Sequence, residues 1–463
     1  MPLIDDEGNL FGVINVIDAL VILFVLAVVA AGAAFLLQPA DSGPDLSSTH
    51  VTLDLGTQPD YLVAEINEGD TYSPDTNTQL TITDVHLTPS GEGTRVIVRA
   101  ELQGPMEDES IVYADAPPRL GRTLDIETSR YVVSGQIREI GDSETLAGDT
   151  ATVVLRDTML ASDAREVAVG DTIRVAGRTV ATINDVAAYA TDNGVERVVF
   201  VEATLQTHHE QGQPQFGGNP LRRGQVVPLS TGDYTYNGRV ERVGSGFERG
   251  SADVLLETVV DSETANRMAE GDVTTVAGHR TAEIESVTTY ATQNPDRQRV
   301  FVGVSLRTLG YGEREQFGST PIQRGNTISL EAESYQLSSS IERVGAVEPR
   351  GTSTTRTVVL RMSEVREQFA ESIEPGMTEQ ANGQRIAIIN HVAVEPSLII
   401  ATGDNGSVNV VEHPINRDVT ITAQLRVRET TSGIRFKGQS IQQQSQVVID
   451  LGTITIEATV VSA

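Results

Sequence analysis

Alternating apolar and polar residues, interrupted by turn residues, dominate the chain after residue 50 and predict β-strands. Branched and aromatic residues fill the runs 197–205 and 299–306, and Asp192-Asn193-Gly194 before the first run is typical of a tight turn. A helical spacing, with Ala265 and Met268 on one face, precedes Gly271. We predict an all-β fold with about six or seven strands and one short helix in each structural unit.

The strand and turn pattern repeats at an interval of about 101 residues. Gly170-Asp171 is followed 101 residues later by Gly271-Asp272, and Gly69-Asp70 precedes it by the same interval. The fourth copy has Gly376-Met377 instead. Because Gly suits the turn after a helix and Asp can accept hydrogen bonds from turn amides, we predict a structural role for these residues, with ligand binding as the alternative.

A second block, which contains one tyrosine, closes each of the first three copies. Tyr131, Tyr234 and Tyr335 each follow an Arg-Gly or Arg-x-Gly sequence by about ten residues, and the fourth copy has lost this block. We predict that these tyrosines are buried and bond their hydroxyls to the backbone. The alternative is a row of tyrosines along a ligand groove.

A unit of about 100 residues can bury its own core, and a closed or partly closed barrel would leave few exposed strand edges. The predicted organisation is therefore an N-terminal transmembrane helix followed by about four tandem β-barrel-like repeats. The boundaries are 1–38 for an acidic tail and anchor, 39–50 for a linker, 51–145, 150–246 and 251–347 for repeats 1 to 3, and 353–463 for a divergent repeat 4.

The run from Ala19 to Leu37 has no charged residue and is long enough to span a bilayer as a helix. We predict a single-pass anchor in contact with lipid through residues 19–37, and a cleaved signal peptide is the alternative. No basic residue precedes Arg95, so the positive-inside rule does not decide the orientation. The β-rich body and one glycosylation sequon at Asn405 favour an extracytoplasmic location for most of the chain, in the cell membrane.

Composition narrows the possible partners. The net charge is −30, with 64 acidic and 34 basic residues, and Lys437 is the only lysine. An acidic, arginine-dominated surface is typical of proteins from extreme halophiles and argues against nucleic acid as a partner. The chain has no cysteine, which excludes disulfides and thiol chemistry.

Candidate chemistry is sparse. His208-His209-Glu210 is the one cluster that suggests a metal, but adjacent residues on a strand point to opposite faces, so we predict a solvated loop and no metal site. No nucleophile elbow, phosphate-binding loop, dinucleotide fingerprint or zinc-protease helix is present. We therefore predict no catalytic residues, no cofactor and no enzymatic activity.

The segment from Asp5-Asp6-Glu7-Gly8 through residues 15–21 resembles a haloarchaeal family of single-pass membrane proteins, domain of unknown function 4330. That resemblance implies an anchor followed by β-rich extracytoplasmic units and no known activity. The stretch 170–186 is also similar to the strand-turn-strand pattern of Mce (mammalian cell entry) domains, β-barrels found in tandem behind one helix. Ala181 and Ala282 stand where that pattern has its second glycine.

Two functions follow from these patterns. The first is a non-enzymatic cell-envelope stalk, scaffold or partner-binding module, which binds envelope proteins or further copies of itself. The alternative is an Mce-like oligomer in which stacked barrels enclose a tunnel for lipid or solute.

Overall fold

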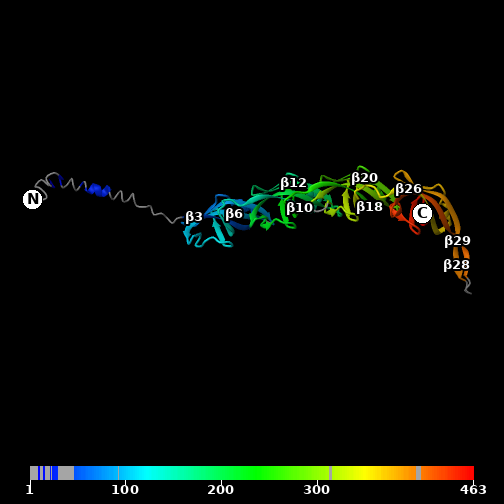
Figure 1. Ribbon diagram of the computed structural model, residues 1–463, viewed down its shortest axis with the longest axis horizontal. Helices are drawn as coiled ribbons and strands as arrows, with labels where there is room; N and C mark the ends of the chain where they lie inside the picture. The colour runs from blue at the N-terminus through cyan, green and yellow to red at the C-terminus, as the bar shows by residue number, and fades with distance from the viewer. Residues whose placement is uncertain are drawn as a thin grey trace. The chain divides into compact units, whose positions relative to one another are not determined.

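The structure is a computed structural model that describes residues 9–10, 14–15, 21, 23–29, 46–91, 93–311, 315–402 and 408–463. Figure 1 shows the helices and strands of the described chain, which divides into two compact units. Unit 1 comprises residues 1–86 and 96–146, and unit 2 comprises residues 87–95 and 147–463.

Near the N-terminus, β1 (Asn9–Leu10) pairs with β2 (Ile14–Asn15). Of the predicted membrane span 19–37, the structure describes residues 21 and 23–29, which are helical. Within the described segments, no helix combines the length and the apolar character that a membrane crossing requires. The sequon residue Asn405 lies outside the described residues.

Repeat 1 forms one seven-stranded antiparallel sheet with the order β4-β5-β6-β3-β9-β8, and β7 pairs with β6. Its elements are β3 (Leu46–Gln58), α2 (Asp60–Val63), β4 (Thr71–Asp75), β5 (Thr78–Ser90), β6 (Gly93–Glu107), β7 (Ser110–Ile111), β8 (Thr123–Glu127) and β9 (Val132–Gly141).

Repeats 2, 3 and 4 form eight-stranded sheets of one common plan. Repeat 2 consists of β10 (Gly148–Leu160), α3 (Ala161–Ala164), β11 (Thr172–Val175), β12 (Arg178–Ala190), β13 (Glu196–Glu210), β14 (Gln213–Phe216), β15 (Asn219–Pro220), β16 (Val226–Ser230) and β17 (Thr235–Val243). Repeat 3 consists of β18 (Glu248–Asp261), α4 (Ser262–Arg267), β19 (Val273–Val276), β20 (His279–Ala291), β21 (Arg297–Gly310), β22 (Gln316–Phe317), β23 (Thr320–Pro321), β24 (Thr327–Glu331) and β25 (Gln336–Val344). Repeat 4 consists of β26 (Thr352–Arg366), α5 (Glu367–Glu371), β27 (Thr378–Ala381), β28 (Gln384–Thr402), β29 (Val408–Thr430), β30 (Gly433–Phe436), β31 (Gln439–Ile441), β32 (Gln446–Asp450) and β33 (Thr455–Ser462).

The all-β, tandem-repeat prediction is confirmed, with four barrel-like sheets. In repeat 3 the hydrogen-bonded order is β19-β20-β21-β18-β25-β24, and the two end strands, β19 and β24, also contact each other. The sheet therefore curls until its edges meet without a hydrogen-bonded ladder at the seam. The prediction of six or seven strands is too low for repeats 2 to 4, because two short strands follow the longest hairpin and carry too few residues to show an alternation.

Apolar side chains fill the inside of each curled sheet. Alternation along the long strands places branched residues such as Val300, Val302 and Val304 inside, each fully buried. The cores of repeats 2 and 3 are not separate, however. Tyr189 and Phe200 of repeat 2 belong to the same buried cluster as the core of repeat 3. The prediction of independent domains therefore fails at this joint, because aromatic side chains of one repeat complete the core of the next.

Candidate functional site

The predicted Gly-Asp and Tyr positions meet at the seam of each of the first three barrels. The Tyr hydroxyl donates to the Asp carboxylate in Tyr131–Asp70 (2.7 Å), Tyr234–Asp171 (2.7 Å) and Tyr335–Asp272 (2.8 Å). The same carboxylate oxygen also accepts a backbone N–H three residues earlier, at 2.9 Å in all three repeats. Gly69, Gly170 and Gly271 provide the preceding turn with φ angles between 88° and 93°.

This link differs from the prediction in one respect: the Tyr hydroxyl bonds to a side chain and not to the backbone. Burial raises the pKa of all three tyrosines, and the hydrogen bond to the carboxylate raises it further. In repeat 4, Met377 and Ile454 take the places of Asp and Tyr, and both pack against the core. Both hydrogen-bond partners are replaced together by apolar residues that pack in the same place. This indicates a structural role for the Tyr–Asp pair and not a ligand-binding one.

Removing one hydroxyl tests the contribution of this link to stability. We expect Tyr131→Phe to lower the free energy of unfolding by about 1–2 kcal/mol, because the Asp70 carboxylate loses a partly buried hydrogen bond. Tyr61→Phe is the matched control, since the Tyr61 side chain is 76% exposed in the same repeat. Thermal unfolding of both variants in the same molar salt measures the difference, and equal melting temperatures would contradict the prediction.

Buried aromatic side chains form the centre of the joint between repeats 2 and 3. Tyr189 packs edge-on against Phe317 with ring centroids 4.9 Å apart, and its hydroxyl donates to the carbonyl oxygen of Arg307 at 3.1 Å. Phe200 packs on Tyr311 at 5.1 Å. Gly318 lies directly beneath Tyr189, where a Cβ would come within 3.1 Å of the tyrosine side chain.

The residues of repeat 4 that face repeat 3 differ from the equivalent residues of repeat 3 that face repeat 2. The register defines the equivalence, because Leu309 pairs with Gln316 in repeat 3 as Arg428 pairs with Arg435 in repeat 4. Both pairs are related by an offset of 119 residues. With this offset, three of the residues that change are Leu309 to Arg428, Tyr311 to Thr430 and Gly318 to Lys437.

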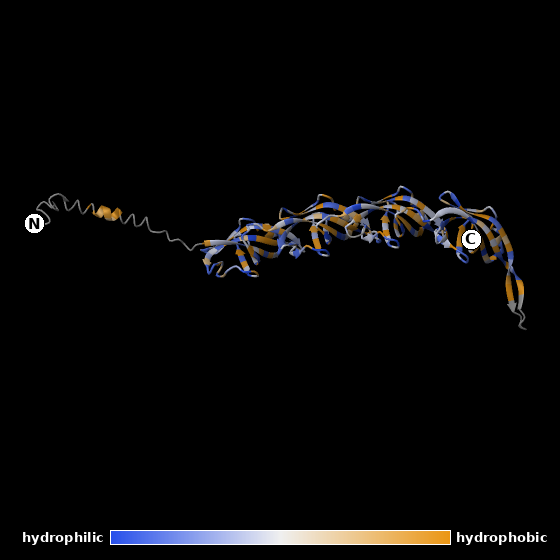
Figure 2. Ribbon diagram, viewed as in Figure 1, coloured by the Kyte–Doolittle hydropathy of each residue, from blue (hydrophilic) through white to orange (hydrophobic). Residues whose placement is uncertain are grey.

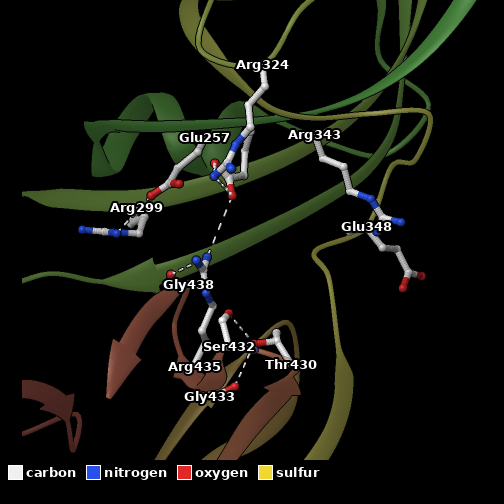
Figure 3. Close-up of polar contacts among 11 residues, drawn as sticks. Glu257, Arg299, Arg324, Arg343, Glu348, Thr430, Ser432, Gly433, Arg435 and Gly438 are labelled. Carbon is white, nitrogen blue, oxygen red and sulfur yellow. Dashed lines mark hydrogen bonds and ion pairs between the residues drawn. The ribbon is translucent and has the colours of Figure 1, made fainter. Parts of the chain in front are cut away.

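These three changes accompany an open joint. Tyr290, the equivalent of Tyr189, is only half-buried, and a cleft of about 650 Å³ lies between repeats 3 and 4. Tyr290 and Phe301 form part of its wall. Figure 3 shows charged and polar side chains of both repeats around this opening, with Arg435 directed from repeat 4 towards the pair formed by Arg324 and Glu342.

Cations dominate the lining of this cleft. Besides Lys437, six arginines line it: Arg324, Arg343, Arg350, Arg426, Arg428 and Arg435. Glu342 and Glu429 are the two lining acids. Arg428 and Arg426 are close enough to Tyr290 to offset part of the increase in its pKa that burial causes.

Lys437 occupies a position that suits glycine. Its φ is 51°, close to the 63° and 59° of Gly217 and Gly318, and a side chain in that conformation costs about 1–2 kcal/mol. The ammonium is buried against Glu379 and donates to the carbonyl oxygen of Val448 at 2.9 Å. Burial lowers the pKa of Lys437 and raises that of Glu379, while the attraction between the two groups opposes both shifts.

At the joint between repeats 3 and 4, Arg350 lacks the acidic partner that its equivalent in repeat 3 has. Its equivalent at the joint between repeats 2 and 3 is Arg249, which binds Asp185 at 2.6 Å. Ser286 stands at the position of Asp185 in repeat 3, so that acid is missing. Arg350 is exposed and makes no hydrogen bond or ion pair with any residue that the structure describes.

Sequence reasoning did not find this cleft. Its residues come from segments between 255 and 438, and the offset of repeat 4 grows from 105 at Gly376 to 119 at Phe436, which hid the equivalence. The one available signal was Lys437, the single lysine of the chain. The cleft holds no arrangement of nucleophile and base, and the described residues contain no cluster of metal-binding side chains.

The other predicted residues lie elsewhere. His208 and His209 are in β13 near its end, where His208 pairs with Gln215 of β14. His208 is buried and His209 is partly buried, so the predicted solvated loop is wrong. Of the closing-block arginines, Arg324 bonds to both carboxylate oxygens of Glu342, at 2.9 and 3.0 Å, and Arg223 lies 3.6 Å from Glu241.

A second candidate site is the hairpin β28–β29. Its strands have 19 and 23 residues, against 13 and 14 for the equivalent β20 and β21. The additional length extends past the sheet of repeat 4 (Figure 1). Exposed apolar residues cover this extension: Leu398, Ile399, Ile400, Val410, Val411 and Ile415. Figure 2 shows it as a hydrophobic end of the hairpin.

A family model described as Domain of unknown function (DUF4330) matches residues 1–95. The match therefore covers the N-terminal segment and the first part of repeat 1. It supports the resemblance noted from the sequence to that family. No curated protein and no solved structure matches the chain.

Proposed function

We propose that this protein is a non-enzymatic scaffold of the cell envelope, anchored by residues 19–37, whose last repeat presents a hairpin for binding another envelope protein. Most of the chain lies outside the cytoplasm in this proposal, and the acidic surface adapts it to molar salt. The single observation that carries the proposal is the extended, exposed and apolar hairpin β28–β29.

The preceding repeats show how such a hairpin is used. Strand β12 of repeat 2 contacts β19, β20 and β24 of repeat 3, and β20 contacts β27 and β32 of repeat 4. In each case the long hairpin of one repeat docks on the next repeat. Repeat 4 has a longer hairpin, and among the described residues the extension is exposed.

The side chains of the extension favour a protein partner over a bilayer or a second copy. Ile399 pairs with Val411 and Ile400 with Val410, so successive apolar residues face both sides of the hairpin. Segment 386–416 contains no Lys or Arg, which is unfavourable for an anionic lipid surface. In repeats 2 and 3 the hairpin places a tyrosine, Tyr189 or Tyr290, against the next repeat. The extension of repeat 4 carries a run of Ile and Val instead, so it differs from the surface that one repeat uses to contact another.

We expect the double variant Ile400→Asp/Val410→Asp to abolish partner binding while the repeats stay folded, because both residues are more than 60% exposed. A photo-cross-linker at position 399 in intact cells identifies the partner, and the purified partner is then titrated against the wild type and the variant. Leu120→Asp, at a side chain 68% exposed in repeat 1, is the control. Concentration-dependent dimers or flotation with liposomes, either of them lost in the double variant, would contradict a protein partner.

The anchor and its orientation need a separate test. An amine reagent would report poorly on Lys437, whose side chain is 7% exposed. Because the chain has no cysteine, Leu120→Cys creates a single exposed thiol for an impermeant maleimide. We expect labelling in intact cells and a membrane-bound protein that becomes extractable when residues 1–38 are deleted. Labelling only after lysis would place the body in the cytoplasm.

The Mce-like tunnel remains the alternative function. The interior of each barrel is filled by apolar side chains, so a tunnel would require a ring of several copies. Electron microscopy of the detergent-extracted protein distinguishes the two: closed rings with a lumen favour transport, and separate particles favour the scaffold.

A further inference from the structure

The cleft between repeats 3 and 4 carries an excess of positive charge in a strongly acidic protein. Its seven lining cations face the two lining acids, and Glu348 and Glu379 are the further acids paired with lining residues. The cations still exceed these four acids by three, whereas the whole chain has a net charge of −30. The charge of the cleft lining is therefore opposite in sign to that of the whole chain.

Several guanidinium groups keep donors available for a ligand. Arg350 has no partner among the described residues. Arg435 makes only long contacts, 3.5 Å to the carbonyl oxygen of Gly438 and 3.9 Å to Glu342 (Figure 3). Arg428 donates through Nη1 to the carbonyl oxygens of Pro349 and Gly351, and its Nη2 lies 3.8 Å from Glu348. Each guanidinium has five N–H donors, so all three can bind an additional acceptor.

The comparison with the joint between repeats 2 and 3 shows that this charge is not required for docking one repeat on another. There the same positions hold Leu309, Tyr311 and Gly318, and Leu309 and Tyr311 are buried in the apolar cluster that repeats 2 and 3 share. At the second joint the replacements Arg428 and Lys437 both add positive charge, and Lys437 does so in a backbone conformation that disfavours a side chain. These replacements therefore reduce apolar packing between repeats 3 and 4 and line the cleft with positive charge.

We propose that this cleft binds a small organic ligand that carries at least two tetrahedral oxyanion groups, phosphate or sulfate. Guanidinium forks match such groups through paired N–H···O bonds, and a cleft of about 650 Å³ has the size of a small-molecule site. Two such groups carry at least two negative charges, which compensate an excess of three positive charges better than a single carboxylate. The aromatic wall of Tyr290 and Phe301 contacts the apolar part of the ligand.

Calorimetric titration of the full-length protein in detergent, at one fixed molar KCl concentration, tests this proposal. The probes are inorganic pyrophosphate and a disulfated disaccharide, with the unsulfated disaccharide as the neutral control. We expect saturable binding of at least one anionic probe at one site per chain and none of the neutral sugar. The preferred probe identifies phosphate or sulfate as the natural group.

The variants decide where binding occurs. Arg350→Gln and Arg435→Gln, both at partly or fully exposed side chains, should each weaken binding about tenfold because each removes a charged hydrogen bond. Arg165→Gln removes the same charge from an exposed residue near α3 and should leave the affinity unchanged. Equal affinities in all three variants, or no binding of either anionic probe, would overturn the proposal.

Discussion

Replacing Tyr189 with alanine is expected to lower the free energy of unfolding of unit 2 by about 3–5 kcal/mol, the usual cost of truncating a buried aromatic side chain. Tyr189 is 3% exposed, packs against Phe317 and Phe200, and donates a hydrogen bond to the backbone of repeat 3. Its removal should also expose the apolar surface around Leu309. Thermal or denaturant unfolding in molar salt measures the loss.

The matched control for this variant is Tyr290→Ala, the same change at the equivalent position of repeat 3. Tyr290 is only half-buried beside the open cleft, so we expect a loss of less than half that of Tyr189→Ala. The difference between the two variants measures how far the second joint has given up packing. Equal losses would show that the two joints are equally well packed, contrary to their different burial.

A comparable loss is expected from Glu379→Gln. The Lys437 ammonium would then remain buried without its counter-charge, and breaking a buried ion pair in this way costs about 3–5 kcal/mol. Lys437 donates elsewhere only to the carbonyl oxygen of Val448. Arg356, which pairs with Glu429 on the exposed surface, offers the control: Arg356→Gln should cost less than about 1 kcal/mol.

The Glu379→Gln loss should depend on pH with a definite sign. Burial lowers the pKa of Lys437 below its ordinary value, and this decrease grows once Glu379 is neutralised. The unfolded chain then binds more protons than the folded one at alkaline pH, so the stability of the variant should rise as the pH approaches the ordinary lysine value. Unfolding curves at several alkaline pH values, each compared with the wild type, check this. A deficit that stays constant with pH would mean that Lys437 is not the group responsible.

The repeated turns could be predicted because their causes are local. Gly170 takes a positive φ at a turn after a helix, and Asp171 accepts a hydrogen bond from an amide only three residues away. The partner of that Asp could not be predicted in the same way. Tyr234 is 63 residues further along the chain, and only the curling of the sheet brings its hydroxyl to the carboxylate.

The hairpin β28–β29 and the cleft also depend on contacts that the sequence alone does not reveal. The insertion in repeat 4 is visible in the sequence as an apolar stretch, but only the folded chain shows that its side chains are exposed. Leu309 and Arg428 are equivalent only through strand register, since the insertion shifts the spacing between the repeats. Without the strand register, nothing in the sequence assigns Lys437 or Arg350 to a common site.

By itself the sequence therefore determined the elements whose cause is local or periodic: the β-strands, the repeat of about 101 residues, the Gly-Asp turns, the apolar run at 19–37 and the acidic character of the chain. The tertiary structure alone decided which side chains meet. Tyr–Asp links at the seam, the shared core of repeats 2 and 3, and the cation-lined cleft between repeats 3 and 4 all join residues that are far apart in the chain. The reason is physical: alternation and turn chemistry depend on neighbours within a few residues, whereas burial and charge pairing depend on how folded surfaces dock.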